Sequence, residues 1–186
     1  MIDDDISRLP LAVSIGEPGG IGPDTLLQSV TDARAGTIPP LPALVVYGDP
    51  EQLAARAAHL SLDVAIVTDD GTQAAEAPGA LTVHPLTNTM QDMPGVCLEA
   101  NAPGVIEAIE ASVAAIKHGS ARGLITLPIN KKSLYSAGFA HPGHTEFLGA
   151  LAQHYWPGAA VHVPEMMSAS GIWMVTGTVF KSGPAN

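Results

Sequence analysis

The sequence predicts an α/β protein with a mostly parallel sheet and helices on both of its faces. Short apolar runs recur along the chain and alternate with helical segments, which is the pattern typical of parallel sheets. Hydrophobic residues make up 46% of the 186 residues, while aromatic residues make up only 4%. Small aliphatic side chains must therefore fill the core, and this favours a layered α/β domain over an aromatic-rich all-β one.

The expected strands are short and apolar, as strands buried on both faces of a sheet usually are. They cover residues 11–15, 44–47, 64–67, 81–84 and 123–126, and residues 161–163 could form a further one. A turn is expected at residues 69–71 because an aspartate pair precedes a glycine there. Residues 86–98 have no clear period and are expected to form a loop.

Helices are expected after most of these strands, and several of their ends carry recognisable signals. They cover residues 25–30, 51–60, 101–118, 131–137 and 146–155. Asp24 and Thr145 are expected to cap the first and last of these helices, since short polar side chains accept bonds from first-turn N–H groups. Pro50 suits a first helical turn, and Gly119 is expected to end the long helix before it.

Charge and composition exclude several classes of function. The formal net charge is −10, with 18 acidic against 8 basic residues, so the chain lacks the basic surface that nucleic-acid binding requires. The single cysteine, Cys97, cannot form a disulfide within the chain, which fits a reducing compartment. The acidic first residues do not resemble a signal peptide, and no apolar run reaches the roughly 18 residues of a membrane helix. A cytoplasmic protein without membrane contact is therefore expected.

The first candidate for chemistry is the glycine-rich segment at residues 16–23, which lies between an expected strand and an expected helix. Glycines there let backbone approach a ligand, and a helix N-terminus favours an anion. The segment is neither a dinucleotide fingerprint nor a Walker A loop. It could equally be a tight turn whose glycines only satisfy geometry. Glu17 could be solvated or could bond nearby amides.

The second candidate follows the strand at residues 123–126. Ligands of open α/β sheets bind beyond the carboxyl ends of the strands, so Thr126, Asn130 and Lys131 are well placed. A lysine there can hold a phosphate or a carboxylate. The alternative is that Lys131 and Lys132 are exposed lysines at a helix start. Because lysines oppose the helix dipole at that end, the pattern favours a ligand slightly.

The third candidate is His144, with Thr145 beside it. An imidazole next to a hydroxyl can bond a polar substrate or move a proton. The other six histidines are interpreted as ordinary surface or core residues: His59, His84, His118, His141, His154 and His162. No group of His, Cys, Asp and Glu has the spacing of metal ligands.

Five motifs, taken in order, resemble the amino-terminal half of the 4-hydroxythreonine-4-phosphate dehydrogenase family. They are GEPGGIGPD at 16–24, NAP at 101–103, PINKK at 128–132, AGF at 137–139 and HPGHTEF at 141–147. The resemblance implies an isopropylmalate-dehydrogenase-like fold and a homodimer. It implies NAD-dependent oxidation and decarboxylation of a small phosphorylated substrate in pyridoxal phosphate biosynthesis. It also implies that His144 and Thr145 contact the substrate, and Lys131 is expected to help bind it.

The chain departs from the family after about residue 160. The resemblance implies a divalent metal (Zn, Mg or Co) whose first histidine ligand follows a Met-Met pair. Here residues 175–181, after Met166 and Met167, contain no histidine. The expectation is therefore an amino-terminal α/β part at 1–160, a divergent tail at 161–186 that a frameshift would explain, and no carboxyl-terminal half. A chain so truncated is expected to be inactive alone, to lack the metal ligands and to be poorly soluble.

Two alternatives to this function stay open. The chain could come from a related dehydrogenase that acts on another hydroxy acid, such as a phosphothreonate or a cyclic dihydrodiol carboxylate. It could also be a non-enzymatic fragment that binds a small anion or pairs with another subunit. The match around His144 favours the first interpretation.

Overall fold

The computed structural model describes residues 8–68 and 79–157, and it alternates strands with helices along the chain. The elements are β1 (Leu11–Ser14), α1 (Gly22–Ala35), β2 (Leu44–Gly48), α2 (Pro50–His59), β3 (Ala65–Thr68), β4 (Ala80–Pro85), a 3-10 turn (Glu99–Asn101), α3 (Ala102–Lys117), β5 (Gly123–Thr126), α4 (Lys131–Ser136) and α5 (His144–Tyr155). The five expected strands up to residue 126 and the loop at 86–98 are confirmed.

The strands form one parallel sheet in the order β3-β4-β2-β1-β5. Leu11 of β1 pairs with Leu44 on one side and with Gly123 on the other, so β1 lies inside the sheet. The parallel α/β architecture expected from the sequence is confirmed.

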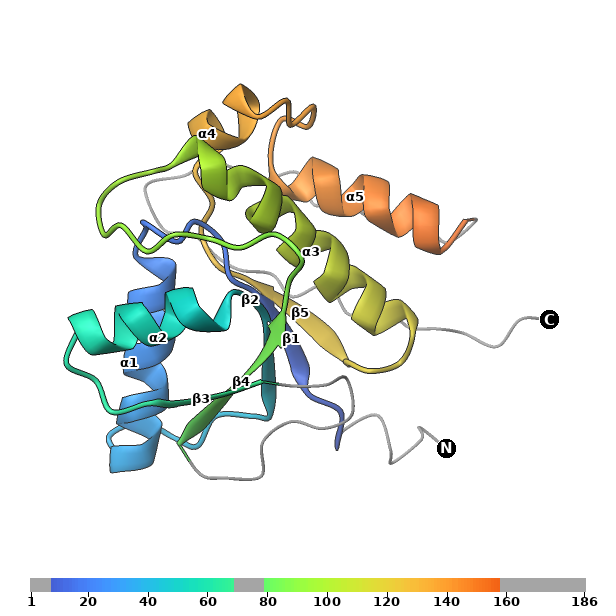
Figure 1. Cartoon of the computed structure of the whole chain (residues 1–186). Coiled ribbons are helices and arrows are strands. Elements are labelled where there is room, and N and C mark those ends of the chain that lie inside the picture. The colour runs from blue at the N-terminus through green and yellow to red at the C-terminus, as the bar shows by residue number, and fades with distance from the viewer. Residues whose placement is uncertain (1–7, 69–78, 158–186) are drawn as a thin grey trace, which may run out of the picture.

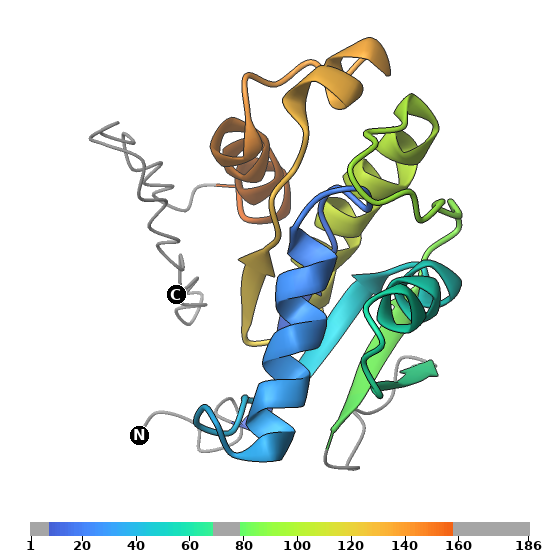
Figure 2. The same cartoon turned by 90° about the vertical axis from the view of Figure 1, so that its left-hand side faces the viewer.

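Helices cover both faces of the sheet (Figures 1 and 2). The connections from β1 through α1 to β2 and from β2 through α2 to β3 step across the sheet in one direction. The connection from β4 through α3 to β5 steps back in the other direction. Since such crossovers are right-handed, α1 and α2 lie on one face and α3 on the other, where α5 packs against it.

This topology makes the chain leave β1 and β5 toward opposite faces. The two strands are neighbours, and α1 follows β1 while α4 and α5 follow β5. In Figure 1, α4 and the loop after β4 gather beyond the carboxyl ends of these strands. Such a switch point is where open α/β sheets bind ligands.

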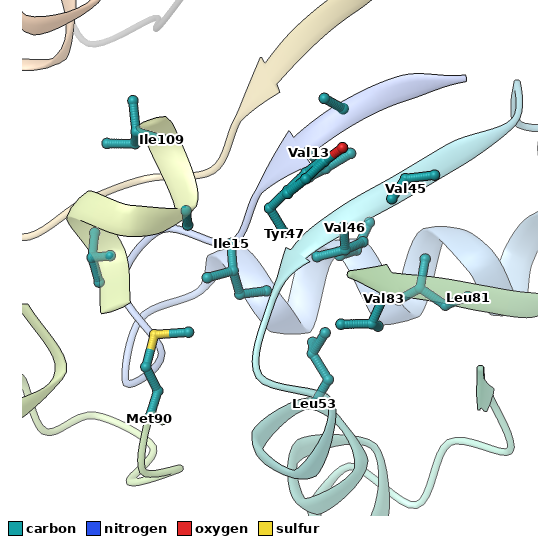
Figure 3. Close-up of a cluster of buried hydrophobic side chains, with 14 of the residues drawn as sticks. Val13, Ile15, Val45, Val46, Tyr47, Leu53, Leu81, Val83, Met90 and Ile109 are labelled. Atoms are coloured by element: carbon teal, nitrogen blue, oxygen red, sulfur yellow. The ribbon is translucent and has the colours of Figure 1, made fainter. Parts of the chain in front are cut away.

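Aliphatic side chains fill the space between the sheet and its helices (Figure 3). Val13, Val46 and Val83 come from three adjacent strands, and Leu53 and Ile109 come from helices on the two faces. All five are almost fully buried. Burying a side chain of this size contributes roughly 1.5–3 kcal/mol, so this core accounts for much of the drive to fold.

Two predicted helix starts are wrong. Helix α1 begins at Gly22 and not after Asp24, and its N-cap residue Ile21 makes no side-chain capping bond. Helix α5 begins at His144, with Gly143 as the N-cap residue, so Thr145 lies inside the first turn. In both helices the polar residue that resembled a cap lies inside the first turn and does not occupy the N-cap position.

Other signals at helix ends are confirmed. Asp49 caps α2 through bonds from the N–H groups of Glu51 and Gln52, and Pro50 occupies its first turn. Gly119 has a φ of +76° just beyond α3. No helix of the described residues is long and apolar enough to span a membrane.

Several predictions fall outside the described residues. They are the turn at 69–71, the further strand at 161–163 and the divergent tail at 161–186. The division of the chain near residue 160 therefore stays a prediction.

Candidate functional site

Three loops from distant parts of the sequence meet at the carboxyl edge of the sheet. Glu17 N donates to Pro128 O at 2.8 Å, which joins the loop after β1 to the loop after β5. Gly95 N donates to Gly19 O, also at 2.8 Å, which adds the loop after β4. These contacts build the floor on which the candidate site residues stand.

The glycines of residues 16–23 permit this close approach of backbone to backbone. Gly16 has a φ of +70°, and a Cβ on it would lie 2.5 Å from Pro128 O. A Cβ on Gly19 would overlap the carbonyl of Val96 and lie 2.9 Å from Met93 O. At these two positions the protein's own chain requires glycine, which supports the geometric interpretation of the segment over the ligand-binding one.

Arg56 of α2, which sequence reasoning did not single out, ties this loop down. Its side chain is 1% exposed, and its guanidinium donates to the carbonyl oxygens of Pro18 and Gly20. It also pairs with the carboxylates of Asp24 and Asp92, the latter at 2.9 Å from Nε. A planar guanidinium suits this task because it offers five donors in a fixed geometry.

The pairing explains why Asp24 is not a helix cap. Its carboxylate lies in the first turn of α1 and accepts from Arg56 Nη1. The spacing of Gln52, Leu53, Arg56 and Ala57, all buried on one face of α2, was the available sequence signal. That signal shows which face is buried, and it does not reveal acceptors 32 or 36 positions away.

Glu17 bonds nearby groups, as one of the two interpretations had it. The residue is 4% exposed, and its Oε1 accepts from Gly19 N at 3.3 Å. Its Oε2 accepts from Ser133 Oγ of α4 at 3.1 Å. Glu17 therefore connects the glycine-rich loop to the segment that carries Lys131.

Helix α4 presents Lys131 at its first residue. The helix is capped by Asn130, whose Oδ1 accepts from Lys132 N at 3.0 Å and from Ser133 N at 3.2 Å. Asn130 Nδ2 also donates to Cys97 Sγ, which ties the cap to the loop after β4. Lys131 itself is exposed, and Thr126 ends β5 close behind it. The predicted trio of Thr126, Asn130 and Lys131 thus lies at the carboxyl edge of the sheet.

His144 begins α5 directly beside Lys131. Lys131 Nζ lies 3.3 Å from the point where a Cβ on Gly143 would stand, so the starts of α4 and α5 are adjacent. His144 Nε2 is buried and has no hydrogen-bond partner among the described residues. Burial, and secondly the positive charge of Lys131, lower the pKa of His144 to about 4. The imidazole is therefore neutral near pH 7.

An aromatic cluster holds the loop between the two helices. His141 lies between Phe139 and Phe147, with ring centroids 5.4 and 4.9 Å away, and the two phenylalanines meet edge to face at 5.1 Å. Tyr135 Oη donates to Pro142 O at 2.7 Å. His141, interpreted from sequence as an ordinary surface or core residue, thus packs in the loop that leads into α5.

The described residues do not fit a bound metal ion. Across 8–68 and 79–157, no three His, Cys, Asp or Glu side chains come together as a group that could ligate one. What the site offers is the exposed ammonium of Lys131, the half-buried imidazole of His144, whose buried Nε2 no described residue bonds, and the hydroxyl of half-buried Thr145. This set can bind a small anionic molecule that carries hydroxyl groups.

Comparison with known proteins points in one direction. The family model described as "Pyridoxal phosphate biosynthetic protein PdxA" matches residues 41–180. The 4-hydroxythreonine-4-phosphate dehydrogenase of Xanthobacter autotrophicus is 38% identical over 163 residues, covering 87% of this chain and 45% of its own length. That of Methylorubrum extorquens is 39% identical over 170 residues, covering 90% and 46%. The chain thus spans about half the length of these curated relatives.

Solved structures agree on the fold. A 4-hydroxythreonine-4-phosphate dehydrogenase from Klebsiella pneumoniae superposes with a TM-score of 0.67 at 29% identity, covering 78% of this chain and 45% of that one. One from Burkholderia phymatum superposes with a TM-score of 0.69 at 23% identity, covering 77% and 43%. Both match the isopropylmalate-dehydrogenase-like architecture expected from the motifs.

Proposed function

Because the chain belongs to the PdxA family of pyridoxal phosphate biosynthetic proteins, we propose that it carries part of the substrate site of a 4-hydroxythreonine-4-phosphate dehydrogenase. The reaction is the oxidation of a hydroxyl group followed by loss of carbon dioxide from the resulting β-keto acid. The observation that carries the proposal is the junction of α4 and α5. There an exposed ammonium lies beside a buried imidazole nitrogen that has no hydrogen-bond partner within residues 8–68 and 79–157.

Each residue of this junction has a distinct task in the proposal. Lys131 holds the phosphate or carboxylate of the substrate as a point charge. His144, neutral near pH 7, offers a ring nitrogen to a substrate hydroxyl, and burial strengthens that bond because the local dielectric is low. The hydroxyl of Thr145 adds a further bond to the substrate.

The proposed oxidant is NAD, which when bound takes up the hydride released with oxidation. The residues described here supply binding and orientation, which by themselves can lower a barrier by holding the reacting groups in place. The divalent metal implied by the resemblance finds no fitting ligands among these residues. We therefore derive no step through a metal from them.

Binding of 4-hydroxythreonine 4-phosphate to the purified 186-residue chain, measured by titration calorimetry, tests the proposal directly. The change Lys131→Met should weaken binding about tenfold or more, since a charge-assisted bond is worth 1.5–3 kcal/mol. The matched control is Lys132→Met, because Lys132 is the next residue, is also exposed and has the same charge. Equal losses in both variants, or no binding by the wild-type chain, would refute the proposal.

The same titration separates the alternative substrates. A phosphothreonate and a cyclic dihydrodiol carboxylate share anionic and hydroxyl groups with the proposed substrate. Tighter binding of either would indicate a related dehydrogenase with another substrate. Formation of NADH by the chain, measured by absorbance, would contradict the non-enzymatic alternative.

Pairing of two chains is part of the proposal. The exposed apolar side chains Ile21, Met93 and Val96 lie on the loops that frame the candidate site. Burial of such side chains in a homodimer would remove apolar surface from water. Light scattering coupled to gel filtration would give the mass of the particle and test this directly.

A further inference from the structure

Glu17 is a buried carboxylate whose position calls for an explanation. It is 4% exposed, at the carboxyl end of β1, where a carboxylate is costly to keep unless it is hydrogen-bonded. Its two oxygens accept from different segments, Oε1 from Gly19 N and Oε2 from Ser133 Oγ. The second bond joins groups 116 positions apart. Glu17 therefore acts between elements as well as within its own loop.

The segment held by this bond is short. Helix α4 has only six residues, far fewer than the 12–15 that an isolated helix needs for even marginal stability. Its position therefore depends on attachments to the rest of the protein. Leu134 is buried at 1% exposure, Asn130 caps the first turn, and Ser133 reaches Glu17.

Lys131 depends on those attachments. It is the first residue of α4, two positions before Ser133, and its Nζ lies beside Gly143 at the start of α5. Glu146 Oε2 lies 3.1 Å from the same point above Gly143, so both charges converge there. A rotation or shift of α4 would move the ammonium away from His144 while leaving the sheet intact.

We propose that Glu17 is a positioning residue of the candidate site. Through its bond with Ser133 it fixes the position of α4 and so holds Lys131 against the first turn of α5. The role of Lys131 and His144 in binding rests on the proposed function. The positional coupling itself is independent of any substrate and is measurable without one.

A simpler explanation is that Glu17 serves only the glycine-rich loop through Gly19. Ser133 Oγ also donates to Asn130 O of its own turn at 3.0 Å. On that explanation, removing the Ser133 hydroxyl would cost only this local bond and leave the surroundings of His144 unchanged. On ours, it loosens α4, lets the ammonium move away and admits water to the imidazole. Both effects raise the pKa of His144 toward its ordinary value, because burial and Lys131 are what lower it.

Titration of the histidine ring signals by NMR on the full 186-residue chain distinguishes the two. We expect Ser133→Ala and Glu17→Gln to raise the pKa of His144 from about 4 by about half a unit or more. The pKa of His144 in Lys131→Met gives the reference shift for complete loss of the ammonium. The control is Ser112→Ala, since Ser112 is also buried but its hydroxyl bonds within its own helix, to Ala108 O.

The outcomes separate this inference from the proposed function. If Ser133→Ala and Glu17→Gln stay folded and leave the pKa of His144 where Ser112→Ala leaves it, the positioning role is wrong. Should Ser133→Ala fail to fold, Glu17→Gln decides, because it keeps the size of the side chain, while its amide nitrogen cannot accept and so the bonds from Gly19 N and Ser133 Oγ cannot both be kept. A shift in pKa together with unchanged substrate binding in Lys131→Met would retain the positioning role and refute the proposed function.

Discussion

The glycine-rich loop at residues 16–23 and the junction of α4 and α5 are the two most conspicuous motifs of the sequence, and they differ in how their polar groups are bonded. In the loop, the carbonyls of Pro18 and Gly20 accept from Arg56, and Glu17 accepts from two donors. At the junction, Lys131 is exposed and His144 Nε2 is buried without a partner among the described residues.

This difference separates scaffold from binding site. Buried polar groups in folded proteins nearly always have a hydrogen-bond partner, so a buried nitrogen without one calls for a ligand or a water. The loop, in which the Glu17 carboxylate and the carbonyls of Pro18 and Gly20 have partners in the protein, forms the base of the site. The junction, with an exposed ammonium and an imidazole nitrogen that no described residue bonds, is the part that can bind a ligand. Four changes would break or sharpen this comparison.

The largest effect is expected for Arg56→Met. The change leaves the carboxylate of Asp92, at 8% exposure, without its charged partner, and removes the donors to two loop carbonyls. Breaking a buried pair in this way costs about 3–5 kcal/mol of unfolding free energy, measurable by urea denaturation. Arg34→Met is the control, since the Arg34–Asp63 pair is exposed and should cost less than about 1 kcal/mol. Equal costs would mean that Arg56 does not hold the loop.

A smaller loss is expected for Gly19→Ala. The new Cβ would overlap the Val96 carbonyl, and backbone cannot yield as a flexible side chain can. Overpacking of this kind costs typically 1–3 kcal/mol, read from the thermal midpoint. In the control Gly123→Ala, the Cβ meets only the end of the Leu11 side chain at 3.0 Å. A neutral Gly19→Ala would show that the loop has room for a ligand after all.

A pH-dependent effect comes from His144. Its pKa is about 4 in the folded protein and about 6.5 when unfolded, so the unfolded state binds more protons between these values. Stability from the neutral imidazole is full above pH 6.5 and is lost as pH falls toward 4. His144→Gln removes this dependence, and we expect the wild type to lose on the order of 1–2 kcal/mol more than the variant across that window. Parallel curves of stability against pH would contradict the burial of the ring.

The smallest effect is expected for Lys131→Met. An exposed side chain outside the core changes stability by no more than about 0.5 kcal/mol, and loss of a positive charge at a helix N-terminus is slightly favourable. Urea denaturation near pH 7 should therefore show the same midpoint or a slightly higher one. A loss as large as that of Arg56→Met would place Lys131 in the scaffold and remove the contrast between the two regions.

Local signals in the sequence predicted most of the fold. The apolar runs located five strands, and Pro50 and Gly119 marked helix ends correctly, because these features act within a few residues. Asp24 and Thr145 were misread as caps for the same reason. A polar residue near a helix start satisfies the local pattern whether it caps or not, and Asp24 instead pairs with Arg56, 32 positions away.

The site was predictable as residues and less so as an arrangement. His144, Thr145 and Lys131 were all named from the sequence, and their roles in substrate binding stay predictions. What the sequence did not show is that Lys131 stands beside the start of α5 or that Glu17 reaches Ser133. Such contacts depend on the packing of α4, which six residues of helix cannot specify by themselves.

The position of β1 between β2 and the edge strand β5 has a consequence for the order in which the protein folds. β1 needs β5 as its second neighbour, and Arg122 Nε donates to Leu9 O across 113 positions. During synthesis, β1 can pair with β2 soon after both leave the ribosome. Its other edge stays unpaired until β5, which lies beyond residue 120, has been made. Pairing across such a separation is slow because a long loop must close first. A nascent chain in that interval exposes an open strand edge, so chaperones should bind it most strongly there.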